Sequence, residues 1–313
     1  MTISGSYDFN PTSDQIITDA YKYIGAVAVG ETPTDDEYTD GRFTLNTMLK
    51  GWQTRQIGLW LNQKCTLYLE YEGESYSLGA TGDHFTTTAQ AVKTELKVAG
   101  VATDLTIDVD SISGLASGDY IGIELDDNTI QWTTINGAPS GDTVTLTAAL
   151  TGACAIDNHV YSYTSKAQRP LEIVEARSVS ETGNEIPLTR ISREEYMQLS
   201  DKTSTGVVTQ FWYDPQLTNG KLYVWPTNDD PKTTIKMTIK KPISDFDASA
   251  DTAEFPQEWI DAIVLNLAIR ISIKKGMPVD KNLKQEADMA LFMAETHDVE
   301  KASTYFQPDT EEG

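Results

Sequence analysis

Histidine is the side chain best suited to acid–base or triad chemistry at neutral pH, and this chain has three: His84, His159 and His297. None lies in a recognisable catalytic motif, because the sequence contains neither G-x-S-x-G nor H-E-x-x-H. It also lacks G-x-G-x-x-G and G-x-x-x-x-G-K-[ST], the glycine-rich motifs that bind nucleotide phosphates. We therefore expect surface or helix-capping roles for the histidines, no cofactor and no enzymatic activity.

Residue types that bind metals are present, but their spacing predicts no metal centre. Cys65 and Cys154 are far apart and belong to no C-x-x-C pair, so we expect two buried thiols. Asp108 and Asp110 would share one side of a strand near Asp104, which could hold calcium, but the spacing is not that of an EF-hand loop. With 47 acidic residues, chance pairs of carboxylates are common, so a hydrolase that acts on cell wall stays open as an alternative.

Aromatic side chains gather in two neighbouring predicted strands, where they could stack on sugars or bases. These are Trp212, Tyr213, Tyr223 and Trp225. Rows of this kind more commonly form cross-strand contacts in the core of a sheet. We interpret them as core residues.

The chain carries a formal net charge of −23 over 313 residues. Such a chain repels phosphate at long range, which argues against tight binding of DNA. An acidic wall could still let DNA slide past it. No apolar run approaches the roughly 20 residues that cross a bilayer, and the first residues do not read as a secretory signal, so we expect neither a membrane partner nor secretion.

Helices are predicted at both ends of the chain. Thr12-Ser13-Asp14 is a group of good N-cap residues before the apolar spacing of residues 16–24. Further helices are expected over 35–56, from Pro256 to Gly276, and over 280–297, and short connections favour antiparallel pairs. A short helix after Ser192 has Glu195 at the capping-box position.

The middle of the chain alternates apolar and polar residues, which predicts strands. A hairpin is expected from residues 65–71 and 75–78, preceded by a short strand at 59–61. Five strands separated by turn residues follow at intervals near ten residues, at 105–109, 120–125, 130–135, 143–146 and 160–163. After these, strands are expected at 169–176, 210–213, 221–226 and 234–240.

These elements predict an α+β protein in which one domain is inserted into another. The host domain has two parts, 1–82 and 166–302, and combines antiparallel helix pairs with a small antiparallel sheet. An all-β domain, sandwich- or barrel-like, is inserted at 83–165. Residues 303–313 form a polar, acidic tail that we expect to be flexible in the free chain.

An ordered series of segments carries a family resemblance. It includes DAYKYIG at 19–25, LNTMLKGW at 45–52, LYVWP at 222–226 and FPQEW at 255–259, with shorter matches at 30–33, 58–60, 76–79, 169–171, 186–188, 195–196, 211–214 and 266–268. Together, over residues 13–80 and 169–297, they resemble the head-to-tail adaptors of short-tailed bacteriophages, the P22-type tail accessory or packaged-DNA stabilisation proteins.

The resemblance implies a virion structural protein, assembled in the host cytoplasm. Such adaptors form a twelvefold ring beneath the portal protein, extend the channel for double-stranded DNA, help retain packaged DNA and dock tail nozzle, needle or fibre proteins. Within the tail we expect Tyr305, Phe306, Gln307 and Pro308 to dock on the portal. A tail-fibre attachment or carbohydrate-binding protein that acts through residues 83–165 is the alternative.

Overall fold

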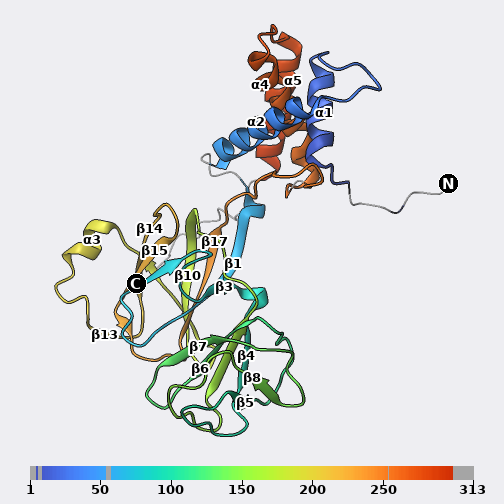
Figure 1. Ribbon diagram of the computed structural model, residues 1–313. Coiled ribbons are helices and arrows are strands. Elements are labelled where there is room, and N and C mark those ends of the chain that lie inside the picture. Colours follow the sequence, from blue (N-terminus) through green and yellow to red (C-terminus); the bar gives the residue numbers. More distant parts are fainter. Residues whose placement is uncertain (1–4, 6–8, 54–57, 253, 299–313) are drawn as a thin grey trace. The chain divides into compact units, whose positions relative to one another are not determined.

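The computed structural model describes the chain except for residues 1–4, 6–8, 54–57, 253 and 299–313. It divides into two compact units, residues 1–61 with 243–313, and residues 62–242. Figure 1 shows helices in the first unit and sheets in the second. We call them the helical unit and the β unit, and each is described by itself.

Within its described residues, the helical unit contains four α-helices and two 3-10 helices. They are α1 (Ser13–Tyr23), α2 (Asp35–Gln53), η1 (Leu59–Leu61), η3 (Gln257–Trp259), α4 (Ile260–Lys274) and α5 (Lys281–His297). α4 lies at the centre and packs on α1, α2 and α5. Because it is surrounded, α4 is apolar on most of its circumference, and its buried residues include Ile263, Leu267 and Ile271.

The helix predictions are confirmed with small shifts at the ends. Thr12 caps α1 in a full capping box with Gln15, and Asp280 caps α5. Gly276 ends α4 as expected, with φ of 68° and its N–H bonded to the carbonyl of Ile273.

Two predictions for the helical unit need correction. Residues 59–61 form a 3-10 helix rather than the predicted strand. Helix α1 packs more extensively on α4 than on α2, so the expected pairing of the first two helices is a minor contact.

The β unit is built from several sheets. One sheet has the order β11-β10-β17-β1-β3 and a second the order β12-β14-β15-β2, while β13 pairs with β16. Their bounds are β1 (Asn62–Tyr68), β2 (Ser75–Leu78), β3 (Phe85–Thr87), β10 (Glu172–Val179), β11 (Glu185–Pro187), β12 (Thr189–Arg190), β13 (Thr205–Gly206), β14 (Gln210–Asp214), β15 (Gly220–Trp225), β16 (Thr227–Asn228) and β17 (Thr234–Lys240). A short helix, α3 (Arg193–Gln198), has the predicted capping box of Ser192 and Glu195.

The two larger sheets share one apolar core. Leu67 of β1 and Ile235 of β17 bury their side chains in it from the first sheet, and Phe211 of β14 and Val224 of β15 do so from the second. Strand alternation explains this arrangement, because every second residue of each strand points to the same face.

The predicted hairpin is wrong. Strand β1 pairs with β17 and β3 in one sheet, whereas β2 pairs with β15 in the other. The turn at Gly73 therefore moves the chain from one sheet to the next. The Tyr76 side chain occupies the space beside Gly73, where an added Cβ would lie 2.4 Å from its hydroxyl.

Residues 92–163 form two further sheets with a separate apolar cluster. The sheets have the order β4-β9-β6-β7 and β5-β8, and Val109, Ile121, Val144 and Val160 lie in their core. The strands are β4 (Val92–Glu95), β5 (Thr106–Asp108), β6 (Tyr120–Glu124), β7 (Ile130–Thr134), β8 (Thr143–Thr145) and β9 (His159–Tyr163), and a 3-10 turn, η2 (Thr88–Gln90), precedes them. The five expected strands are confirmed, and β4 is an addition. Strand β3 lies inside the expected insert but pairs with β1 of the larger sheet.

The chain enters and leaves this segment at neighbouring points. The Thr86 hydroxyl donates to the carbonyl of Ser165 at 2.7 Å, and the Ala167 N–H donates to the carbonyl of Phe85 at 2.8 Å. An inserted segment needs such closely spaced ends.

An aromatic cluster joins this segment to the larger sheet. Tyr68 of β1 lies 5.0 Å from Tyr161 and 5.1 Å from Trp132, measured between ring centroids. The His84 ring stacks on Trp132 at 3.7 Å and its Nδ1 lies 2.7 Å from the Tyr163 hydroxyl. Trp132 also covers Gly122, where a Cβ would approach the indole to 2.8 Å, so only glycine fits there. The junction is a packed interface, not a flexible hinge.

The expectation of surface or capping roles is wrong for two histidines. His84 lies within the aromatic cluster, and burial together with Lys166 lowers its pKa to about 3. His159 is 3% exposed, and its Nε2 lies 2.9 Å from a Glu181 carboxylate oxygen. The ring nitrogens of His159 have no well-aligned hydrogen-bond partner, so the contact with Glu181 is one of proximity. His297 is exposed in the last turn of α5, as expected.

The protein is thus α+β, mostly β, with several antiparallel sheets and few helices. We expected helices and a small sheet in one domain, but the compact units separate helices α1, α2, α4 and α5 from every sheet, and only the short helices α3 and η2 lie in the β unit. The finer limits at 82, 165 and 302 stay predictions.

The pKa of His84 predicts a pH dependence of stability. In the unfolded chain this imidazole takes up a proton below about pH 6.5, whereas in the folded chain it stays neutral until about pH 3. Unfolding therefore becomes easier as pH falls, by up to about 1.4 kcal/mol per pH unit from this group. Urea unfolding between pH 7 and 4 should show a flatter profile for His84→Gln. His297→Gln, which removes an exposed imidazole, should keep the slope of the parent chain, and parallel profiles for all three proteins would contradict the assignment.

Candidate interaction surface on the helical unit

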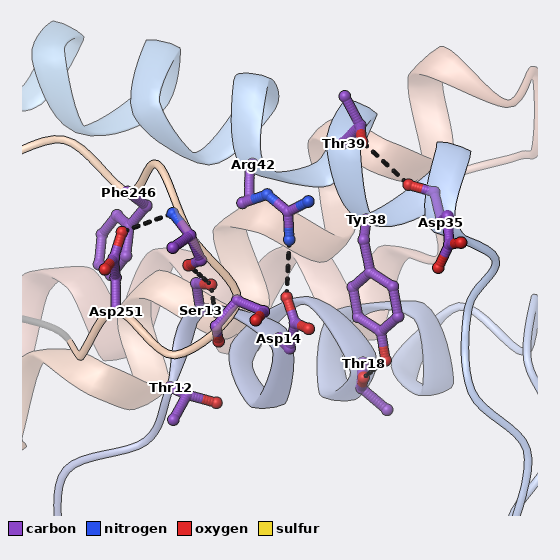
Figure 2. A network of polar contacts seen from close by, with 12 residues as sticks. Thr12, Ser13, Asp14, Thr18, Asp35, Tyr38, Thr39, Arg42, Phe246 and Asp251 are labelled. Atoms are coloured by element: carbon purple, nitrogen blue, oxygen red, sulfur yellow. Dashed lines mark hydrogen bonds and ion pairs between the residues drawn. The ribbon is translucent and has the colours of Figure 1, made fainter.

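Polar contacts fix α1 against α2 (Figure 2). The Arg42 guanidinium donates to the Asp14 carboxylate at 2.8 Å, and the hydroxyls of Thr18 and Tyr38 lie 2.8 Å apart in a hydrogen bond. The Arg42 and Asp14 side chains are 21% and 30% exposed, so this ion pair is shielded more than most surface pairs. The contacts set the angle between two helices whose apolar contact is small.

Residues 243–252, which follow the β unit in the chain, form hydrogen bonds with both α1 and α2. Asn46 of α2 exchanges two hydrogen bonds with the backbone of Phe246, at 2.9 and 3.0 Å. The Ser13 hydroxyl of α1 donates to the carbonyl of Ala248 at 2.8 Å. Asp251 accepts from the N–H groups of Asp247 and Ala248, which lowers the pKa of its carboxyl. Figure 2 shows Phe246 and Asp251 beside this network.

Two lysines at the end of α4 form ion pairs with α2. Lys274 binds Asp40, and Lys275 binds Glu37. The bond from Lys275, together with the backbone N–H of Thr34, lowers the pKa of the Glu37 carboxyl. Both lysines therefore pair within the helical unit.

Beyond this core, α5 carries an exposed apolar stripe. Met289, Phe292 and Met293 are 60%, 67% and 60% exposed, and their spacing of three and four residues places them on one side of the helix. Leu283, Ala287 and Ala294 are the buried side of the same helix. We call the exposed stripe the α5 ridge.

Neutral and acidic residues border the α5 ridge. Helical spacing places the neutral residues Asn282, Gln285 and Thr296 beside it, and the exposed Glu286, three residues before Met289, also lies along it. The row of Met289, Phe292 and Met293 is itself uncharged, whereas a helix face in contact only with water usually carries charged residues. An exposed apolar row of this kind is typical of an interaction site.

A second exposed apolar patch lies where α2 meets the end of α4. Phe43 and Ile273 are 69% and 64% exposed. With Thr47 and Arg270 they line a shallow hollow of about 310 Å³. We call this the α2–α4 patch.

A larger groove of about 510 Å³ lies along α1. Phe9, Gln15, Tyr38 and Val264 are among its lining residues, and its charged lining residues are Asp14, Asp19 and Lys22. It is a second hollow on the helical unit, and its lining carries both signs of charge.

Residues that the sequence singled out lie elsewhere. Tyr305, Phe306, Gln307 and Pro308 are outside the described residues. Asp104 and Asp108 accept hydrogen bonds from the Val101 N–H and the Thr143 hydroxyl, and no group of His, Cys, Asp and Glu that could hold a metal occurs within the described ranges.

The aromatic row divides between two faces of its sheet. Tyr213 is buried in the core, as expected. Trp212 and Tyr223 stack at 4.5 Å on the opposite face, where Tyr196 of α3 packs against both. Half-buried under α3, they are a local packing cluster and not an open platform. Cys65 and Cys154 are buried, as expected, and burial raises the pKa of Cys65 to about 12.

Our sequence analysis missed the α5 ridge, although it carried a signal. Residues 283, 287, 291 and 294 of this helix are apolar and recur at helical spacing, which predicts one buried row. A second apolar row on the opposite side, at 289, 292 and 293, was visible in the same pattern. One helix with two apolar rows predicts an internal contact and an external one.

The exposure of the α5 ridge predicts that it contributes little to folding. Replacing Met289, Phe292 and Met293 together by Ser should change the free energy of unfolding by less than about 1 kcal/mol, because surface substitutions usually have small effects. Ile263→Ala, at a fully buried site of α4, should cost about 2–5 kcal/mol. Urea unfolding of both variants makes the comparison, and a large loss from the triple variant would show that the ridge belongs to the core.

Comparison with known proteins identifies a family for this chain. Residues 85–310 match the family model of the SU10 adaptor protein. The match runs through all of β4 to β9 and on to α5, while α1 and α2 precede it. It supports an adaptor of bacteriophages but does not reach the narrower P22-type group. No curated protein matches the sequence, and no helix in the described part of the chain is long and apolar enough to span a membrane. The chain belongs to the SU10 adaptor protein family and is a structural adaptor of a bacteriophage.

Proposed function

We propose that the protein is the head-to-tail adaptor of its virion. Copies of the chain form a ring, twelvefold by the resemblance of its sequence to short-tailed phage adaptors, beneath the portal. The ring extends the DNA channel, helps retain the packaged DNA and presents a surface to tail nozzle, needle or fibre proteins. It assembles in the host cytoplasm and carries out no catalytic step.

One observation supports this proposal most directly. The helical unit completes its core and still leaves the α5 ridge and the α2–α4 patch exposed. Exposed apolar faces on a folded protein are typical of contacts with other proteins. A structural adaptor needs several such contacts.

The charge of the chain suits a DNA channel. A formal net charge of −23 keeps the phosphate backbone from binding tightly, so that DNA could pass without being held by the wall. The same charge makes copies of the chain repel one another. Apolar subunit contacts would have to outweigh that repulsion.

The tail is the part we propose to dock on the portal. It combines the aromatic residues Tyr305 and Phe306 with Pro308, a composition suited to filling a groove on a partner. Its ordering would cost conformational entropy that the contact has to offset.

Electron microscopy of the purified chain mixed with portal rings of the same phage tests the proposal. The full chain should add a ring to one face of the portal, and deletion of residues 303–313 should prevent this while leaving the urea unfolding curve unchanged. A matched control replaces Thr304 and Thr310 by Ala, and this variant should still bind. Unchanged rings after the deletion would remove the tail from the proposal, and failure of the full chain to cap portals with all virion proteins present would contradict the adaptor function.

A further inference from the structure

We propose that the α5 ridge of one copy packs against the α2–α4 patch of the next copy. This inference rests on the proposed ring and names the surfaces that build it. The contact is heterologous, because each copy offers the ridge to one neighbour and the patch to the other.

The two surfaces have matching shapes and chemistry. The ridge is a row of three long apolar side chains, Met289, Phe292 and Met293, that stands out from its helix. The α2–α4 patch is a hollow of about 310 Å³ with Phe43 and Ile273 among its lining residues. Methionine adapts its shape to aromatic rings, so Met289 and Met293 suit a site that contains Phe43.

The two surfaces belong to opposite ends of α4. Chain reversal at Gly276 sends α5 back along α4, and the Asn266 side chain bonds to the carbonyl of Ala287 at 3.3 Å. Residues 289–293 therefore lie toward the beginning of α4, whereas Ile273 lies in its last turn. Since one copy does not bring its own ridge to its own patch, the partner is a second copy. Repeated heterologous contacts close into rings when the rotation allows.

Charge favours the same pairing. Two acidic residues, Glu286 and Asp288, flank the ridge on α5. Arg270 borders the patch and, among the described residues, has no ion-pair partner. In a chain of −23, a basic group beside an exposed apolar hollow selects an apolar surface with acidic neighbours.

The larger groove on α1 offers the ridge no comparable charge preference. Its charged lining residues are Asp14, Asp19 and Lys22, and Asp14 already pairs with Arg42. Unlike the α2–α4 patch with Arg270, this mixed set does not favour the acidic neighbours Glu286 and Asp288.

Disulfide trapping distinguishes this contact from other arrangements. Two single variants, Phe43→Cys and Phe292→Cys, are mixed in equal amounts under mild oxidation, first as purified chains and then on portal rings. The native thiols are buried and their pKa values are raised, so the new cysteines are the reactive ones. The mixture should form a disulfide-linked dimer several-fold faster than either variant alone, and a chain with both changes should form a ladder of linked multimers.

Leu217→Cys is the matched control. Leu217 is 94% exposed in the turn before β15, and its mixture with Phe292→Cys should link only slowly. Arg270→Glu in the Phe43→Cys chain should slow the specific linkage, and Glu286→Lys with Asp288→Lys in the Phe292→Cys chain should restore it. Urea unfolding of each variant shows that the fold is kept.

Each outcome bears on the pairing itself. The inference is overturned if the mixture of Phe43→Cys and Phe292→Cys forms disulfide-linked dimers no faster than the mixture with Leu217→Cys. It is also overturned if Phe292→Cys alone forms dimers equally fast, because that result indicates a symmetric contact between two ridges. If variants that remove the ridge still form rings on portals, the pairing is wrong while the adaptor function stands. If the parent chain forms no rings, the proposed function fails instead.

Discussion

Electrostatic repulsion between copies is the constraint on which the surface of this protein depends. At −23, any two chains that approach at random meet a like charge, and repulsion of this kind keeps proteins soluble and apart. The ring that we propose would nevertheless require contacts between copies of the chain. The way to satisfy both demands is to keep most of the surface acidic and to reserve uncharged, apolar faces for defined contacts.

The helical unit follows this division. Its internal contacts are apolar around α4 and are completed at the edges by ion pairs, Arg42 with Asp14 and Lys275 with Glu37. Several basic side chains of this unit are therefore used inside it. Among the described residues, its outer surface then carries the α5 ridge and the α2–α4 patch, which Arg270 borders, and these two surfaces would give contacts between copies their direction.

The β unit holds residues 92–163 against its larger sheet through a packed junction. Its two larger sheets share one core, and residues 92–163 have another. Aromatic rings from both sides, with His84 between Trp132 and Tyr163, fill the junction. A junction packed with rings resists bending, so the segment would present its outer surface in a fixed orientation to the larger sheet.

The sequence by itself determined the local elements. Capping residues and periodic apolar spacing located α1, α3, α4 and α5, and the alternation of side chains located the five strands between residues 105 and 163, because these signals act over a few residues. The tertiary structure decided what depends on distant partners. It paired β1 with β17 instead of β2, placed half-buried His84 in the aromatic cluster and His159 in a buried site, and turned Met289, Phe292 and Met293 outward. Strand pairing and burial depend on which segments meet in space, and local spacing does not specify that choice.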